Sequence, residues 1–264
     1  MMDEGSHAMG FTAFYWELAD LPDPALRAAA LDLAAWREPA RRDAAFHRLL
    51  RSDSSPAQGI AMDAYARAEM DERWGLANPF AASQEAVRQR ARAQLAGPPV
   101  AVQRATGVIA ANYASALGAL LNLAEPDDAP LIARVLASSP DPAVLDTGLR
   151  AAACALAAGD GADQPALIAA LAAMAATPDL DARERAAALR ALAAGGTPAC
   201  AAALLAALDD PDGHVQATAA WMLADDLDRH GPRLRSLVAG WPPDAPYPAS
   251  EVRLALDDAA DDGG

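Results

Sequence analysis

Apolar residues recur along most of this chain three and four residues apart, which is the period of a helix with one buried side. Residues 178–196 show the pattern most clearly: Pro178 and Asp179 open the segment, an alanine-rich stretch follows, and Gly195 and Gly196 close it. Proline favours the first turn of a helix, and glycine favours its end. Because similar units lie on both sides, the sequence predicts a stack of short helices.

Three units between residues 127 and 227 repeat this pattern. Leu131-Ile132 in the first unit matches Leu167-Ile168 in the second, 36 residues later, and the third unit begins at Pro198. A proline followed by an aspartate lies in the turn within each unit, at 139–141, 177–179 and 210–212. A period of about 33 to 38 residues is typical of two-helix repeats. A degenerate last unit follows from Pro232.

The first part of the chain has helical segments that do not follow this repeat. Start and stop signals predict helices at 24–36, 41–50, 54–74 and 83–95, and an apolar run predicts a long buried helix from about 100 to 123. In the third of these, Asp63 and Glu69 precede Arg67 and Arg73 by four residues, which is the spacing of ion pairs on a helix surface. The section 54–80 departs most from the repeat.

Composition agrees with an all-α protein. Alanine accounts for 73 of the 264 residues, and aromatic residues for only 5%. Alanine is the best helix former, whereas strands favour β-branched and aromatic residues. Cys154 and Cys200 belong to no CxxC motif or Cys/His cluster, so neither a zinc site nor a disulfide framework is expected, and both are predicted to be small core residues.

The charge of the chain makes nucleic acid an unlikely partner class. The net charge is −15; residues 1–104 hold 12 arginines and 14 acids, and the rest of the chain holds 9 arginines and 22 acids. Nucleic-acid affinity depends largely on Lys and Arg that neutralise phosphates, so an acidic surface opposes it.

No membrane or secretion signal is recognised. The apolar run 108–123 is shorter than the ~20 residues of a membrane span. Residues 1–10 lack an apolar signal sequence and include Gly5 to Met9, which could be a cloning remnant, so they are given no functional weight. We expect a cytoplasmic protein, a monomer by default.

The repeat units resemble HEAT repeats, which belong to the armadillo-like α-solenoid families. The resemblance rests on the proline/aspartate turn and on a second helix of the form D-x-x-x-R-x-x-A-x-x-A-L, as at 181–192. It covers 127–227 well, the first 50 residues weakly and 54–123 hardly at all. HEAT repeats usually have Val-Arg at the start of the second helix; here that position reads Arg-Glu-Arg at 183–185 and Val-Gln at 215–216.

The resemblance implies a right-handed α-solenoid, a single elongated domain over 11–264 that binds a partner on its concave side. It would comprise an N-terminal hairpin at 11–53, an irregular section at 54–126, regular repeats at 127–230 and a cap with an acidic tail at 231–264.

If the second helix of each unit lines the concave side, a step of 100° per residue gives its solvent-facing positions. They form one candidate binding ridge: Asp146, Arg150, Arg183, Arg190, His214, Trp221 and Asp225. Trp and Arg are frequent interface hot spots. The alternatives are that Trp221 is buried between repeats and that His214 is simply a polar residue in the first turn of a helix.

A second candidate is a carboxylate pocket in the irregular section, made of Asp63, Glu69, Glu72, Arg73 and Trp74. Its alternative is a set of ordinary ion pairs beside a tryptophan that anchors an insertion. The four histidines are scattered and no nucleophile motif is recognised, so no catalytic residue, metal or cofactor is predicted. Asp209, Asp210 and Asp212 lack EF-hand spacing and are expected to end and cap helices.

The sequence therefore favours a non-enzymatic scaffold that binds a protein or peptide. HEAT-like enzymes are an alternative, because this class includes alkylpurine DNA glycosylases and bilin lyases. A third possibility is an acidic immunity or inhibitor protein that covers a basic partner.

Overall fold

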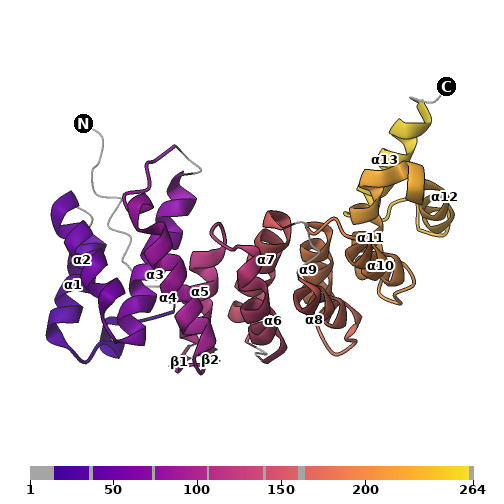
Figure 1. Ribbon diagram of the computed structural model, residues 1–264. Coiled ribbons are helices and arrows are strands. Elements are labelled where there is room, and N and C mark those ends of the chain that lie inside the picture. The colour runs from indigo at the N-terminus through magenta and orange to yellow at the C-terminus, as the bar shows by residue number, and fades with distance from the viewer. Residues whose placement is uncertain are drawn as a thin grey trace. The chain divides into compact units, whose positions relative to one another are not determined.

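A computed structural model describes residues 15–35, 38–72, 75–105, 107–138, 141–159 and 164–261. The chain is largely α-helical, as predicted, and consecutive helices pack against one another (Figure 1). It divides into two compact units. The N-terminal unit comprises residues 1–124 and 138–151, and the C-terminal unit comprises 125–137 and 152–264. The predicted single domain over 11–264 stays a prediction.

The N-terminal unit is built from helices that are consecutive in sequence, together with the first part of α7. Helix α1 packs against α2, and α3 and α4 both pack against α5 (Figure 1). The bounds are α1 Pro24–Ala35, α2 Pro39–Arg51, α3 Ser55–Glu72, α4 Gln84–Ala96, α5 Ala111–Leu120 and α7 Pro142–Ala158, with short 3-10 turns η1 Leu18–Asp20 and η2 Ala81–Ser83. Phe46 of α2 stacks on Phe80, with ring centroids 4.1 Å apart, and anchors the loop before η2 in the core.

The prediction of one long helix from about 100 to 123 is wrong. An antiparallel hairpin, β1 Ala101–Arg104 and β2 Gly107–Ala110, precedes the shorter helix α5. Gly107 has φ +126°, a conformation that other residues rarely adopt. The β-branched residues Val102, Val108 and Ile109 favour strands, so an apolar run alone did not distinguish a hairpin from a buried helix.

The C-terminal unit contains the second and third predicted helix pairs, whereas the first predicted pair, at 128–162, is divided between the two units. Helix α8 packs on α9, α10 on α11, and α9 on α11 of the following pair (Figure 1). The bounds are α6 Ala129–Ser138, α8 Pro165–Ala176, α9 Ala182–Ala193, α10 Pro198–Ala207, α11 Gly213–Leu223, α12 Leu227–Val238 and α13 Ala249–Asp261, with 3-10 turns η3 Pro126–Asp128 and η4 Ala224–Asp226.

Local capping explains where these helices begin and end. Asp181 and Asp212 accept hydrogen bonds from backbone N–H groups in the first turns of α9 and α11; capping was predicted for Asp212 but not for Asp181. Gly196 follows α9 with φ +58°, the left-handed conformation that often ends a helix. Cys200 is buried and Cys154 half-buried, and both are free thiols.

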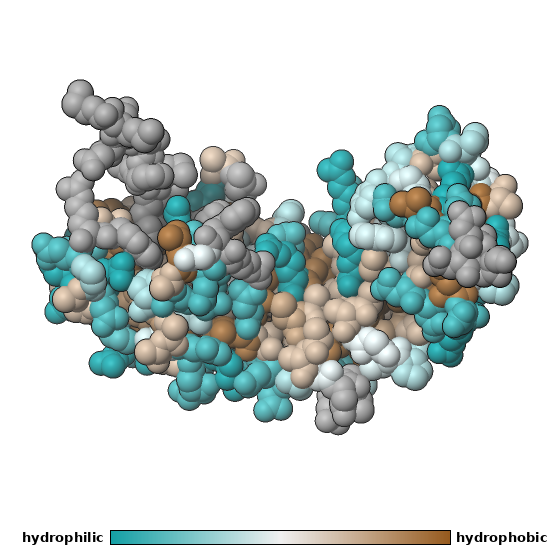
Figure 2. Space-filling model, turned by 90° about the horizontal axis from the view of Figure 1, so that it is seen from above, coloured by the Kyte–Doolittle hydropathy of each residue, from teal (hydrophilic) through white to brown (hydrophobic). Residues whose placement is uncertain are grey.

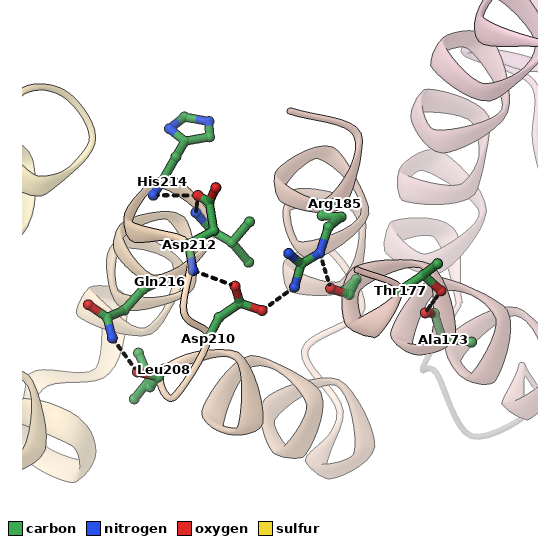
Figure 3. Close-up of polar contacts among 10 residues, drawn as sticks. Ala173, Thr177, Arg185, Leu208, Asp210, Asp212, His214 and Gln216 are labelled. Carbon is green, nitrogen blue, oxygen red and sulfur yellow. Dashed lines mark hydrogen bonds and ion pairs between the residues drawn. The ribbon is translucent and has the colours of Figure 1, made fainter. Parts of the chain in front are cut away.

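A buried arginine joins three segments of the C-terminal unit (Figure 3). The Arg185 guanidinium of α9 donates from Nε to the Ala175 carbonyl of α8, at 2.9 Å, and forms an ion pair with Asp210 in the turn between α10 and α11. Asp210 in turn accepts from the Asp212 backbone N–H at 2.9 Å. Both charged side chains are about nine-tenths buried, with exposures of 8% and 10%. Arg185 therefore couples one helix pair to the next.

Gln216 makes the corresponding contacts in α11. Its side-chain amide donates to the Leu208 carbonyl at the end of α10, at 2.9 Å, and its Oε1 accepts from Trp241 Nε1 at 2.9 Å. Arg185 and Gln216 thus lie at equivalent positions, each four residues after a capping aspartate, and both bond a carbonyl of the preceding helix or turn.

Within the described parts of the chain, no helix has the length and apolar character needed to cross a membrane.

We expect Arg185→Ala to lower the free energy of unfolding by about 3 kcal/mol, because it leaves the buried Asp210 carboxylate without its counter-charge. Arg183→Ala, in the same helix but exposed, should change it by less than about 0.5 kcal/mol. Urea unfolding followed by circular dichroism measures both. Equal effects of the two substitutions would show that the Arg185 ion pair does not stabilise the unit.

Candidate functional site

The C-terminal unit carries five of the seven predicted ridge residues. Arg183 and Arg190 are exposed on α9, Asp225 is exposed in η4, and His214 and Trp221 of α11 are partly exposed. We call these five residues the α9–α11 face. In Figure 3 the His214 imidazole extends away from the hydrogen bonds around Asp212, whose carboxylate accepts from the His214 backbone N–H at 2.8 Å.

Packing sets the direction of this face. Helix α9 buries Ala186 and Leu189 completely, and α11 buries Val215 and Ala219 completely. Arg183 and Arg190 are seven residues apart, as are His214 and Trp221, so each pair lies on nearly the same side of its helix, away from those buried residues. Because α9 and α11 pack together, the two pairs occupy equivalent positions on neighbouring helices.

Trp221 is neither free in solvent nor fully buried, because it contacts an aromatic residue from the loop before α13. Its ring meets that of Tyr247 edge to face, with centroids 5.2 Å apart and an interplanar angle of 69°. Tyr247 itself is 56% exposed. The sequence pattern does not single out Tyr247; its place in the proline-rich turn 241–248 indicates a loop, but not the helix that the loop contacts.

The remaining two ridge residues, Asp146 and Arg150, belong to the N-terminal unit. Both are exposed on α7. Their charges act on the hydroxyl of Tyr15, which lies in the segment that precedes η1.

The two units differ strongly in charge. The C-terminal unit has 8 arginines and 20 acids, a net charge of −12, whereas the N-terminal unit has 13 arginines and 16 acids. Over the end of the molecule that carries α11, α12 and α13, at the right of Figure 2, hydrophobic residues stand singly or in small groups among hydrophilic ones. Tyr247 and Leu254 are exposed large hydrophobic residues in this unit, at 56% and 55%.

The predicted carboxylate pocket in the irregular section is not assembled by the residues that the structure describes. Glu69 accepts hydrogen bonds from the Tyr65 hydroxyl at 2.8 Å and from Asn78 Nδ2 at 2.6 Å, and so ties the loop after α3 to the helix. Burial, followed by the bond to Glu69, raises the pKa of Tyr65. Glu72 is exposed. Arg73 and Trp74 lie outside the described residues.

Asp63 is separate from Glu69 and is buried, so the prediction that it forms a surface pair with Arg67 is wrong. Arg67 is exposed, whereas Asp63 is 8% exposed and faces Ser115 of α5. The Ser115 hydroxyl bonds the carboxyl group, but Oδ2 has no hydrogen-bond partner among the described residues. Burial raises the pKa of Asp63 from 3.8 to about 7, against the opposing effect of the bond to Ser115.

Trp16 completes this buried cluster, although no pattern in the sequence pointed to it. Its indole Nε1 donates to Ser115 Oγ at 3.0 Å, and the side chain is 1% exposed. The ring lies directly on Gly59, one turn before Asp63: a Cβ at position 59 would stand 1.9 Å from Nε1. Only glycine leaves room for the indole here.

Tyr15 lies at the edge of the same cluster. Burial, with the charges of Asp63, Asp146 and Asp141, raises the pKa of its hydroxyl to about 12, and Arg150 opposes the shift. Asp141 has a structural role as well, because its carboxylate accepts from the backbone N–H groups of Ala110 and Ala143, both at 2.9 Å. We call Tyr15, Trp16, Asp63 and Ser115 the Asp63 cluster.

Chemically, the Asp63 cluster contains a carboxyl group that is close to half-protonated near neutral pH, a state that lets it donate or accept a proton. The described residues contain no group of three His, Cys, Asp or Glu side chains that could hold a metal ion. The prediction that Asp212 caps a helix is confirmed, whereas the ion pair of Asp210 with Arg185 was not predicted.

Comparison with known proteins identifies no relative: no protein-family model and no curated protein sequence matches this chain.

We expect Asp63 to make stability depend on pH. A folded-state pKa of about 7, above the usual 3.8, means that the folded protein holds this proton while the unfolded chain releases it, so stability falls from about pH 4 to pH 7 and is lowest above pH 7. The full penalty corresponds to about 4 kcal/mol. Asp63→Asn should therefore be more stable than wild type at pH 8 but not at pH 4, as measured by urea unfolding.

The matched control is Glu72→Gln, which neutralises an exposed acid in the same helix. A difference between Asp63→Asn and wild type that is the same at pH 4 and pH 8 would contradict the assignment.

Proposed function

We propose that this protein is a HEAT-like α-solenoid that binds a protein or peptide and has no catalytic role. The observation that carries the proposal is the α9–α11 face together with Tyr247: exposed arginines lie on α9, and Trp221 of α11 contacts Tyr247 of the loop before α13. Three kinds of side chain gathered here, Trp, Tyr and Arg, are those most enriched among interface hot spots.

Several contacts support the comparison with HEAT repeats. Proline/aspartate turns at 177–179 and 210–212 join the two helices within each pair, and the second helix of one pair packs on the second helix of the next. Arg185 and Gln216 tie these second helices to the preceding helix. In the HEAT family the second helices line the concave side, which is where the α9–α11 face would then lie.

The face is suited to binding because little of it contributes to folding. Arg183 and Arg190 are exposed, and the Tyr247 ring is more than half exposed, so a partner can contact them without unfolding any helix. Trp221 is already fixed against Tyr247, so a partner that stacks on this pair does not have to order the indole first.

We expect the double variant Trp221→Ala and Arg190→Glu to lose a binding partner that the wild type retains. Removing a hot spot costs about 2 kcal/mol or more, so the combined loss of affinity should exceed about 30-fold. The immobilised protein is incubated with cell extract, and quantitative mass spectrometry identifies the proteins enriched by the wild type. Their affinities are then measured with the purified partner by isothermal titration calorimetry.

The control is Arg229→Glu, which makes the same charge change on the exposed surface of α12 in the same unit. It should keep the partner, and all variants should retain the helical circular dichroism spectrum. If the double variant binds the partner as tightly as wild type does, the α9–α11 face is not the binding surface.

A second candidate function is an acidic inhibitor or immunity-type protein that covers a basic partner. The net charge of −12 on the C-terminal unit favours it, since complementary charge accelerates association and excludes acidic partners.

Under this second candidate, the affinity for the purified partner should fall at least tenfold between about 50 and 300 mM NaCl, because salt screens exposed charges. Neutralising three exposed acids of the C-terminal unit together, with Asp225→Asn, Asp228→Asn and Glu251→Gln, should flatten that dependence. If the affinity of the wild type does not change with salt, the acidic-inhibitor candidate is contradicted and the α9–α11 face remains the basis of binding.

A further inference from the structure

The geometry points to a proton-controlled latch in the N-terminal unit. We define the latch as residues 15–21, the segment that carries Trp16 and η1. When Asp63 holds a proton, the latch is closed over α3 and α5; when Asp63 ionises, the latch is released. This inference is independent of the proposed binding function.

The closed latch is held at both ends and in the middle. Trp16 and Leu21 are buried side chains, at 1% and 0% exposure. Arg104 of β1 donates to the Tyr15 carbonyl at 3.0 Å and forms ion pairs with Asp20 and, at 3.6 Å, with Glu17. The latch therefore contacts the hairpin through charges and the helices through an indole.

Asp63 is linked to the latch through a single shared hydroxyl group. Ser115 Oγ accepts from the Trp16 indole at 3.0 Å, and the same hydroxyl bonds the Asp63 carboxyl. The second carboxyl oxygen, Oδ2, is enclosed and has no hydrogen-bond partner in the described part of the chain. A negative charge enclosed with one hydrogen bond and no counter-ion is unfavourable.

Release of the latch relieves this cost. The Trp16 ring covers the surface of α3 at Gly59, one helical turn before Asp63, so its departure opens a path for water towards the carboxylate. Because the open state hydrates the charge and the closed state does not, closing takes up a proton and ionisation favours opening.

The neighbouring groups do not replace Asp63 in this role. Helix α5 has no charged residue, and its Tyr113 hydroxyl donates to the Gly97 carbonyl at 2.8 Å. Helix α4 meets α3 through neutral Gln94, which bonds Gln58 at 2.6 Å. Around the cluster, the charges of Asp141, Asp146 and Arg150 act on the Tyr15 hydroxyl, and the latch carries Glu17 and Asp20. Helix α2, which packs on α3, carries the ionisable residues Arg41, Arg42, Asp43, His47, Arg48 and Arg51.

Those groups carry both signs, and several contact other partners. Asp141 caps α7, Arg42 lies over the Phe80 ring at 5.8 Å, and Glu17 and Asp20 pair with Arg104. Asp146 is the exposed acid whose charge acts on the Tyr15 hydroxyl, so its substitution tests whether it, rather than Asp63, causes the pH dependence. The raised pKa of Asp63, about 7, puts the proton-dependent range between pH 4 and pH 7.

Hydrogen–deuterium exchange of the intact protein tests the latch directly. Backbone protection of residues 15–21 is measured at pH 5.0 and pH 8.0 and corrected for the intrinsic pH dependence of exchange. We expect protection in the wild type to be at least about tenfold lower at pH 8.0, with the amides of α3 and α5 unchanged. Asp63→Asn should keep the pH 5.0 level of protection at both pH values.

Two further variants separate the latch from its surroundings. Asp146→Asn should respond to pH as the wild type does. Gly59→Ala places a methyl group where the Trp16 indole lies, so residues 15–21 should lose protection at both pH values while α3 and α5 keep theirs.

The latch is overturned if wild-type protection of residues 15–21 is the same at both pH values, or if Asp63→Asn loses protection at pH 8.0 as the wild type does. It is also overturned if all amides of the N-terminal unit lose protection together, because that result describes unfolding of the unit. Should Asp63→Asn fail to fold, Ser115→Ala provides the second test: by removing the shared hydroxyl it should lower latch protection at pH 5.0.

Discussion

The buried guanidinium of Arg185 holds three segments of the C-terminal unit together. Its charge is tolerated because the Ala175 carbonyl and the Asp210 carboxylate both face it. These two partners belong to the helix before α9 and to the turn before α11, so satisfying one side chain fixes how α9 sits between them. With Arg185 turned inward, Arg183 and Arg190 must face solvent. The exposed face is therefore a consequence of a structural contact, and Gln216 has the same effect on Trp221 in the next pair.

The buried ionisable group of the N-terminal unit, Asp63, has fewer partners than Arg185 has. Asp63 has one hydroxyl partner and an oxygen that the described residues leave unbonded, where Arg185 has a carbonyl and a carboxylate. A satisfied buried ion stabilises a single arrangement, whereas a poorly satisfied one stabilises the protonated form and makes the structure around it sensitive to pH. The region that follows the repeat pattern least is thus the one in which we propose that packing depends on a proton.

Local sequence signals predicted the elements that local forces determine. Proline at helix starts, capping aspartates and closing glycines gave the helix pairs α8–α9 and α10–α11, because each of these residues acts within one turn. The hairpin before α5 was missed because an apolar run satisfies a buried helix as well as a pair of short strands, although Gly107 marked the turn. Asp63 was assigned to the surface because a four-residue spacing to Arg67 is visible in sequence, whereas Trp16 and Ser115, which enclose it, are 47 and 52 residues away.

The same distinction explains why the two candidate sites could not be found equally well. The α9–α11 face follows from helical periodicity, because residues seven apart share a side of a helix whatever packs behind them. Only its loop contribution, Tyr247, depends on a contact between distant segments. The Asp63 cluster consists entirely of such contacts, since an extended segment, two helices and a glycine must meet for the indole to reach Ser115. The exposed face of repeated helices can therefore be predicted from residue spacing, whereas a buried polar site depends on which distant residues pack together.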